Sequence, residues 1–144
     1  MDEAILNWDV TERVLVVCAT PGTISDASFD PLLEEIRANR NIDACLATSL
    51  GAQKMTVIQR TDAAQLLRDR AFKTVVLTDS RVTRGILTAI SWFGGDISAR
   101  ALDDVDGGLD ALELRGSRRT AVREVAERLR HQLEAATRRG QRSA

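Results

Sequence analysis

Aromatic and histidine side chains are scarce in this chain of 144 residues, which has no tyrosine, three phenylalanines, two tryptophans and one histidine. A nucleic-acid site that stacks bases on aromatic rings is therefore not expected. The one histidine, His131, lies among Arg and Glu residues near the end of the chain. A Ser-His-Asp triad would require that segment to fold back over the loops of the rest of the chain, so we do not expect one.

Cysteine is also scarce, and the two present, Cys18 and Cys45, each lie inside an apolar run. We interpret both as reduced core thiols, although the two could face each other on neighbouring strands. With two cysteines and one histidine, a closed zinc site would need carboxylates to complete it. We therefore expect no metal and no cofactor.

Long apolar runs are missing, and the longest ones, such as residues 14–19, contain only a few residues. A membrane-spanning helix needs about 20 apolar residues, so no such span is expected. The acidic start, Met1-Asp2-Glu3, lacks the basic segment that begins a secretory signal peptide. We therefore expect a cytoplasmic protein, and the 44% of apolar residues are enough for one hydrophobic core.

The net charge of −1 hides an uneven distribution. Residues 1–114 contain eleven Lys or Arg and eighteen Asp or Glu, a net charge of −7. Residues 115–144 contain nine Arg and three Glu, a net charge of +6. We therefore expect two parts: a domain at 1–114, and a basic amphipathic helix with a frayed tail at 115–144.

Five short apolar segments have the length and the flanking turn residues of β-strands: residues 4–8, 13–19, 42–48, 74–78 and 97–102. The polar segment 9–12 is short enough to be a hairpin turn between the first two. The consecutive Val75, Val76 and Leu77 indicate a central strand that is buried on both faces. The last strand is expected at an edge of the sheet.

Helical spacing of apolar residues predicts a helix after each strand from the second onward, and one more at the end of the chain. Pro31 is expected in the first turn of the first helix. The residues expected to be buried are Val57, Ala64, Leu67 and Ala71 on the second helix, and Val82, Ile86, Ala89, Ile90 and Phe93 on the third. Ser80 is expected to cap the third helix, and Thr120 the last one after a Gly116-Ser117 linker.

The resulting order, β-β-α-β-α-β-α-β-α-α, predicts an α/β fold. Strands joined by single helices run parallel through right-handed crossovers. The first hairpin adds one antiparallel strand. We therefore expect a small mixed β-sheet with an N-terminal hairpin and helices packed on it, plus an extra C-terminal amphipathic helix.

The same order resembles the STAS superfamily, the fold of the bacterial anti-sigma-factor antagonists. The resemblance covers about residues 10–114 and is most specific where VVLTDS, VTRGILTAISWF, ISARAL, an Asp-rich turn and LDALE follow one another. The final helix is not part of that pattern. The resemblance implies a STAS-like domain with a regulatory, signalling or scaffolding role exerted through protein–protein contacts, and no enzyme activity.

In the switching members of that superfamily, a Ser or Thr in an Asp-Ser-(Ser/Thr)-Gly motif follows the third strand, and a kinase-type partner phosphorylates it. The matching region here reads ATSLGAQ; Ser49 is near the corresponding place, but the Asp and the Ser-Gly pair are missing. A related STAS-like branch is associated with apolar small ligands. The alternatives are therefore a protein that binds a small apolar ligand or an anion, or a minor enzyme that uses the loops after strands three and four.

The candidate contact residues lie in three places. Thr48, Ser49 and Thr56 lie at or after the end of the third strand, Asp79, Ser80 and Arg84 follow the fourth strand, and Trp92 lies near the end of the third helix. Open α/β sheets usually meet ligands at the carboxyl ends of their strands. A phosphoryl-accepting Asp79 would need an acidic pair after the second strand, which is missing, so we interpret Asp79 as a cap of the helix that begins near Val82. Arg81 and Arg84 could bind an anion there or pair with Asp79. An exposed Trp92 would suit an interface.

The last helix has the most regular apolar stripe of the chain: Val122, Val125, Ala126, Leu129, Leu133 and Ala136. An isolated helix of this length is marginal in water, so the stripe needs a partner. Three partners remain open: the chain's own sheet, a second copy in a homodimer, and another protein. Although the helix is rich in arginine, we expect no nucleic acid, because glutamates are interleaved with the arginines.

Overall fold

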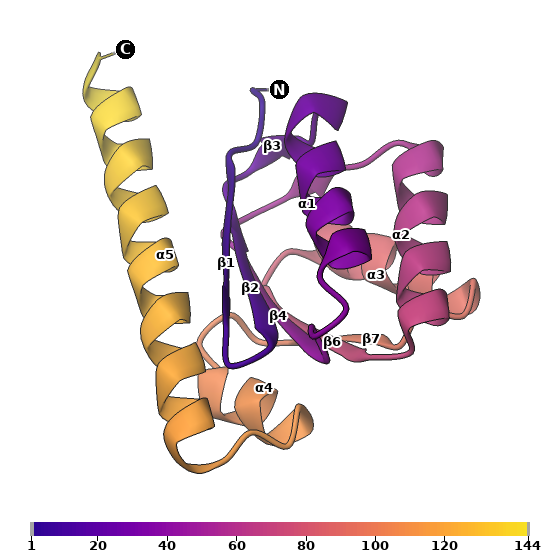
Figure 1. Cartoon of the computed structure of the whole chain (residues 1–144). Helices are drawn as coiled ribbons and strands as arrows, with labels where there is room; N and C mark the ends of the chain where they lie inside the picture. Colours follow the sequence, from indigo (N-terminus) through magenta and orange to yellow (C-terminus); the bar gives the residue numbers. More distant parts are fainter. Residues whose placement is uncertain (1, 144) are drawn as a thin grey trace.

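The sheet at the centre of the fold has five strands in the order β1-β2-β4-β6-β7 (Figure 1). The computed structural model describes residues 2–143, and its strands are β1 Leu6–Thr11, β2 Val14–Ala19, β4 Ala44–Ser49, β6 Lys73–Leu77 and β7 Ile97–Arg100. Strand β1 is antiparallel to β2, whereas β2, β4, β6 and β7 run parallel. The carboxyl ends of the four parallel strands therefore meet at one end of the sheet, and the predicted edge position of β7 is confirmed.

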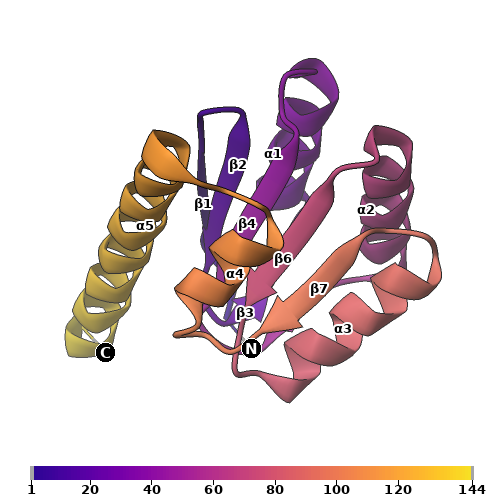
Figure 2. The same cartoon turned by 90° about the horizontal axis from the view of Figure 1, so that it is seen from below.

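Helices cover both faces of this sheet (Figure 2). One face carries α1 Asp26–Ala38, α2 Val57–Arg70 and α3 Arg81–Trp92, and the other carries α4 Val105–Ala111 and α5 Gly116–Ser143. The predicted mixed α/β fold, with an N-terminal hairpin and an added C-terminal helix, is confirmed.

Two hydrophobic clusters lie on opposite sides of the sheet, because neighbouring residues of a strand point to opposite faces. On β2, Leu15 and Val17 face α1, α2 and α3, whereas Val16 faces α4 and α5. The last helix adds four buried side chains to the second cluster: Val122, Ala126, Leu129 and Leu133. The structure therefore shows that the apolar stripe of α5 packs on the chain's own sheet, which was one of the three possible partners. A homodimer remains a prediction and would have to use another surface.

The hairpin turn is tighter than predicted, because β1 continues to Thr11 and only Glu12 and Arg13 connect it to β2. Both turn residues have positive φ angles, 50° for Glu12 and 65° for Arg13. A two-residue loop with positive φ at both positions favours Asn-Gly. Side chains with a Cβ atom therefore strain the backbone at this turn.

Arg13→Gly is expected to raise the free energy of unfolding by about 0.5–1 kcal/mol, because glycine adopts positive φ without a steric penalty. The substitution also removes an ion pair with Asp43 at 3.6 Å, but this pair is exposed and contributes little. Urea denaturation followed by circular dichroism measures the change. Arg40→Gly, at an exposed position without positive φ, is the matched control. An equal gain in that variant would contradict the presence of strain at the turn.

A second, two-stranded sheet has no counterpart among the predicted elements. Strand β3 Gly22–Thr23 pairs in parallel with β5 Gln53–Lys54. The N-terminal segment joins it, because the Thr23 backbone N–H donates to the Asp2 carbonyl oxygen at 2.8 Å. Gly22 has a φ of 137°, and a Cβ atom there would lie 2.2 Å from that same oxygen, so only glycine fits. Strands of two residues are too short to show a periodic pattern, so they could not be predicted.

Several helix boundaries differ from the prediction. Pro31 lies in the second turn of α1 rather than the first, because that helix begins right after the N-cap Ser25. Helix α5 begins at Gly116, so residues 116–117 form its first turn and not a linker. Thr120 lies inside this helix instead of capping it, and its hydroxyl donates to the Gly116 carbonyl at 3.3 Å. The helix also continues through Ser143, where a frayed tail was expected.

Helices α2 and α3 bury only part of the faces predicted: Ala64, Leu67 and Ile90 are buried as expected. Val57 and Ala71 of α2 and Val82 and Phe93 of α3 are exposed. The side chains that these helices do bury are Gln59, Ala64, Leu66 and Leu67 on α2, and Thr83, Leu87 and Ile90 on α3. The four exposed residues lie in a first turn or at a C-cap, so they are at helix ends, away from the middle of the sheet.

Candidate functional site

A buried polar network joins the loops at the carboxyl ends of β2 and β4. Its centre is Gln53 of β5, which is 4% exposed. The side-chain amide of Gln53 donates to the Thr20 carbonyl at 3.0 Å. Its amide oxygen accepts from the hydroxyls of Ser49 and Thr83, the latter at 3.1 Å. The network therefore links β2, β4, β5 and α3 through a single side chain.

The hydroxyl groups of this network are all used inside the fold. The Ser49 hydroxyl lies 2.8 Å from the Gly51 carbonyl oxygen, and the Thr83 hydroxyl lies 3.2 Å from the same atom. Ser49 and Thr83 are buried, at 4% and 5% exposed. Hydrogen bonds of this kind fix the loop conformation, and they leave no hydroxyl directed at solvent.

The predicted contact residues Thr48 and Ser49 do not reach the surface, since both are 4% exposed. Ser49 ends β4, whereas the residue at the start of α2 is Thr56. Thr56 is exposed, and its hydroxyl accepts the backbone N–H of Gln59 at 3.0 Å as part of a capping box. The structure thus puts Thr56, and not Ser49, at the start of the second helix.

Asp79 does not cap α3, contrary to our interpretation. Its carboxylate accepts the Leu102 backbone N–H at 3.0 Å, which ties the β6–α3 loop to the loop after β7. Ser80 is the N-cap, as predicted, and its hydroxyl accepts a first-turn N–H at 3.2 Å. Arg84 donates to the Thr78 carbonyl at 3.0 Å, so this guanidinium supports the loop after β6.

Exposed aliphatic side chains lie next to these loops, in the first turns of α2 and α3. Val57 is 67% exposed, Ile58 73% and Val82 54%. We call these three residues the α2–α3 surface. The two helices pack against each other, and both begin at the carboxyl end of the parallel strands. The α2–α3 surface is therefore at the end of the sheet where open α/β folds usually bind.

Trp92 lies apart from the other predicted contact residues. It is 80% exposed, as anticipated, and its neighbour Phe93 is 59% exposed. Ten residues of α3 separate Trp92 from Val82, which places it about 15 Å away along the helix axis. Trp92 therefore lies at the opposite end of α3 from Val82.

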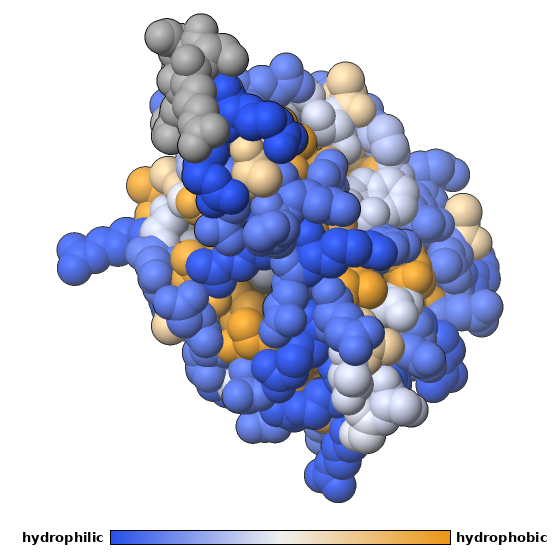
Figure 3. All heavy atoms as spheres, turned by 90° about the vertical axis from the view of Figure 1, so that its left-hand side faces the viewer, coloured by the Kyte–Doolittle hydropathy of each residue, from blue (hydrophilic) through white to orange (hydrophobic). Residues whose placement is uncertain are grey.

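The basic charge of α5 is paired with the acidic body of the same chain. Five arginines make such pairs: Arg118 with Asp43, Arg119 with Asp106 and Asp110, Arg123 with Asp106, Arg128 with Asp9, and Arg130 with Asp103. Hydrogen bonds from Arg123 and Arg119 hold the pKa of Asp106 below its ordinary value. The face formed around α5 is mainly hydrophilic, with small apolar areas between the charges (Figure 3). The uneven charge distribution is thus used, at least in part, to dock α5 within the chain.

The two cysteines lie on opposite faces of the sheet, Cys18 under α5 and Cys45 under α1 and α2, so they do not face each other. Both thiols are free and buried, and burial raises the pKa of each to about 12. A thiolate, the form that attacks or binds metals, is therefore disfavoured at both positions. Within residues 2–143 no group of three His, Cys, Asp or Glu could hold a metal ion. In the same range no helix is long and apolar enough to cross a membrane.

Comparison with known proteins yields similarity of fold alone. No protein-family model matches the sequence, and no curated protein matches it either. Among solved structures, the chain is similar to an uncharacterised protein of the DUF3478 family with a SpoIIAA-like fold, from Shewanella loihica. The two are 16% identical over 76% of this chain and 93% of the other, with a TM-score of 0.48.

Proposed function

We propose that this protein is a non-catalytic regulatory or scaffolding domain that acts by binding another protein through the α2–α3 surface. The observation that carries the proposal is the exposure of Val57 and Ile58 side by side in the first turn of α2. Single exposed aliphatic residues are common on protein surfaces. Val57 and Ile58 are consecutive, and with Val82 in the first turn of α3 they lie at the end of the sheet where partners usually bind.

The first turn of α2 holds this area in a fixed conformation. Thr56 and Gln59 form a complete capping box, in which the Thr56 backbone N–H also donates to the Gln59 side chain at 2.9 Å. Gln59 is 3% exposed, and it donates further to the Ile24 carbonyl at 2.9 Å. A rigid surface loses little conformational entropy when it binds, which favours a contact with a folded partner.

Three of the side chains that a minor enzyme or an anion site would use here are engaged in other bonds. The Ser49 hydroxyl is enclosed in the Gln53 network, and Asp79 accepts the Leu102 N–H. Arg84 donates to a backbone carbonyl. These bonds support a structural role for the loops and a binding role for the apolar residues beside them.

Ile58→Asp is expected to weaken partner binding by at least tenfold, because burying an unpaired carboxylate in an apolar contact costs more than about 1.4 kcal/mol. An Asp in the first turn of a helix complements the helix dipole, so the fold should keep its melting temperature. A pull-down from the native cell, read by mass spectrometry, identifies the partner, and titration calorimetry measures its affinity for both chains.

Phe93→Asp is the matched control, because it places the same charge on another exposed apolar residue, at the C-terminal end of α3. This variant should bind the partner as the unmodified chain does. Equal binding by Ile58→Asp would refute the α2–α3 surface. Loss of binding only in Phe93→Asp would move the contact to the Trp92 end of α3.

A further inference from the structure

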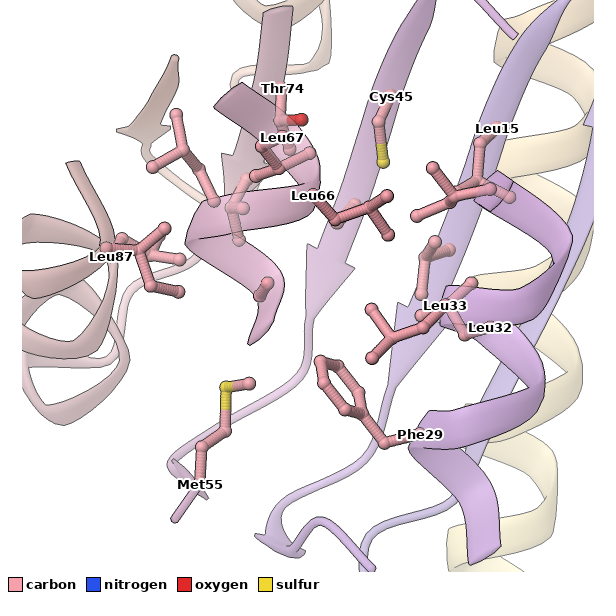
Figure 4. Close-up of a pocket in the computed structure, with 17 residues that line it drawn as sticks. Leu15, Phe29, Leu32, Leu33, Cys45, Met55, Leu66, Leu67, Thr74 and Leu87 are labelled. Atoms are coloured by element: carbon pink, nitrogen blue, oxygen red, sulfur yellow. The ribbon is translucent and has the colours of Figure 1, made fainter. Parts of the chain in front are cut away.

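An apolar cavity of about 150 Å³ lies between the sheet and helices α1, α2 and α3 (Figure 4). Strands β2, β4 and β6 form its floor, and side chains such as Phe29, Leu66 and Leu87 come from the three helices above. No charged side chain lines it. Protein interiors are normally packed with few voids larger than a water molecule, so a cavity of this size requires an explanation.

One polar group in the wall of this cavity has no nitrogen or oxygen partner. Thr74 of β6 lines the cavity and is 4% exposed. In the part of the chain that the structure describes, its hydroxyl is the one buried side-chain polar atom without a nitrogen or oxygen partner. Burying an unpaired hydroxyl is unfavourable, and valine would fill the same place on the strand without that penalty.

The nearest polar neighbour does not satisfy this hydroxyl. Cys45 is the partner of Thr74 in the register of β4 and β6, and it also lines the cavity. A hydrogen bond from the Thr74 hydroxyl lowers the pKa of the Cys45 thiol, but the effect of burial, which raises it, is larger. A thiol is a weak donor and a weak acceptor, so the Thr74 hydroxyl keeps its capacity for a stronger partner.

We propose that this cavity binds a small uncharged molecule, about the size of one aromatic ring, with one polar atom that hydrogen-bonds to the Thr74 hydroxyl. A dry apolar cavity of about 150 Å³ in another protein binds benzene. The apolar wall excludes charged groups, because nothing in it would compensate for their lost hydration. The volume excludes long-chain lipids.

Met55 marks the place where such a molecule would enter. It lines the cavity and is only partly buried, whereas most other lining residues are fully buried. Its side chain lies at the rim, on the segment between β5 and α2 (Figure 4). Methionine is unbranched and has three rotatable bonds, so it can move aside without a change in the backbone.

Phenol and benzene are suitable probes, because they differ only in the hydroxyl group. Phenol is expected to bind the full chain saturably, with a dissociation constant of about 1 mM or lower, in methyl NMR titrations. Thr74→Val should weaken phenol about three- to tenfold and leave benzene within about twofold. Thr48→Val is the matched control: it changes a threonine that is equally buried on the neighbouring strand but does not line this cavity, and it should alter neither affinity.

Filling the cavity should abolish binding of both probes. Ala47→Leu and Ala63→Leu add side-chain volume from the sheet and from α2 respectively, so one of them remains informative if the other does not fold. The proposal is overturned if neither probe binds saturably, or if a folded filling variant binds as well as the unmodified chain. Equal weakening of phenol and benzene by Thr74→Val would also overturn it, because the hydroxyl would then have no part in recognition.

Discussion

Leu133→Ala is expected to lower the free energy of unfolding by about 2–4 kcal/mol, although the residue lies near the end of the last helix. Leu133 is 2% exposed and packs in the same cluster as Val16 and Leu46 of the sheet. Its truncation would open a cavity in that cluster. Since small domains have a total stability of about 5–15 kcal/mol, the loss is a large fraction. Urea denaturation at several protein concentrations measures it.

Gln132→Ala is the control, because it changes the exposed neighbour of Leu133 on the same helix. It should change the stability by less than about 0.5 kcal/mol. If Leu133→Ala behaved like this control, α5 would not be docked on the sheet in solution. If its effect depended on protein concentration, the stripe would be buried in a dimer instead.

Gln53→Leu is the second substitution with a large expected effect. It should lower the free energy of unfolding by about 2–3 kcal/mol. Leucine has a similar size, but it cannot hydrogen-bond to the Thr20 carbonyl or to the hydroxyls of Ser49 and Thr83. Those groups would remain buried and partly unpaired, and the desolvation of each is unfavourable. Thermal or urea unfolding measures the change.

Gln65→Leu makes the same substitution at an exposed position of α2 and should be nearly neutral. Equal stabilities of the two variants would show that the network contributes nothing. A selective loss in Gln53→Leu would establish that the loops at the carboxyl end of the sheet are held in place by one amide.

The architecture could be predicted because strands and helices leave different periodic patterns. The consecutive Val75, Val76 and Leu77 indicated a central strand, and β6 is indeed flanked by β4 and β7. The order of elements then left few possible topologies. The buried face of a helix was harder to predict. Phe93 fits an apolar stripe by its spacing, but it lies at a C-cap, where no sheet is beneath it.

The candidate site was predicted only in outline. The junction after β6 was identified, yet Gln53 and Thr83, which organise the neighbouring loops, were missed because a polar residue gives no sign in the sequence that it is buried. The cavity was missed for a related reason. It depends on how three helices meet the sheet, and no local pattern of residues records an unfilled volume.

The docking of α5 has a consequence for the order in which the protein is made. The sheet side chains of the second cluster begin at Val14, whereas the last residue that covers them is Leu133. At about 5–20 residues per second, synthesis of the second follows that of the first by roughly 6–24 s. During that interval this face of the nascent sheet lacks the cover of α5, so a chaperone that binds apolar strands would find its target before the ribosome releases the chain.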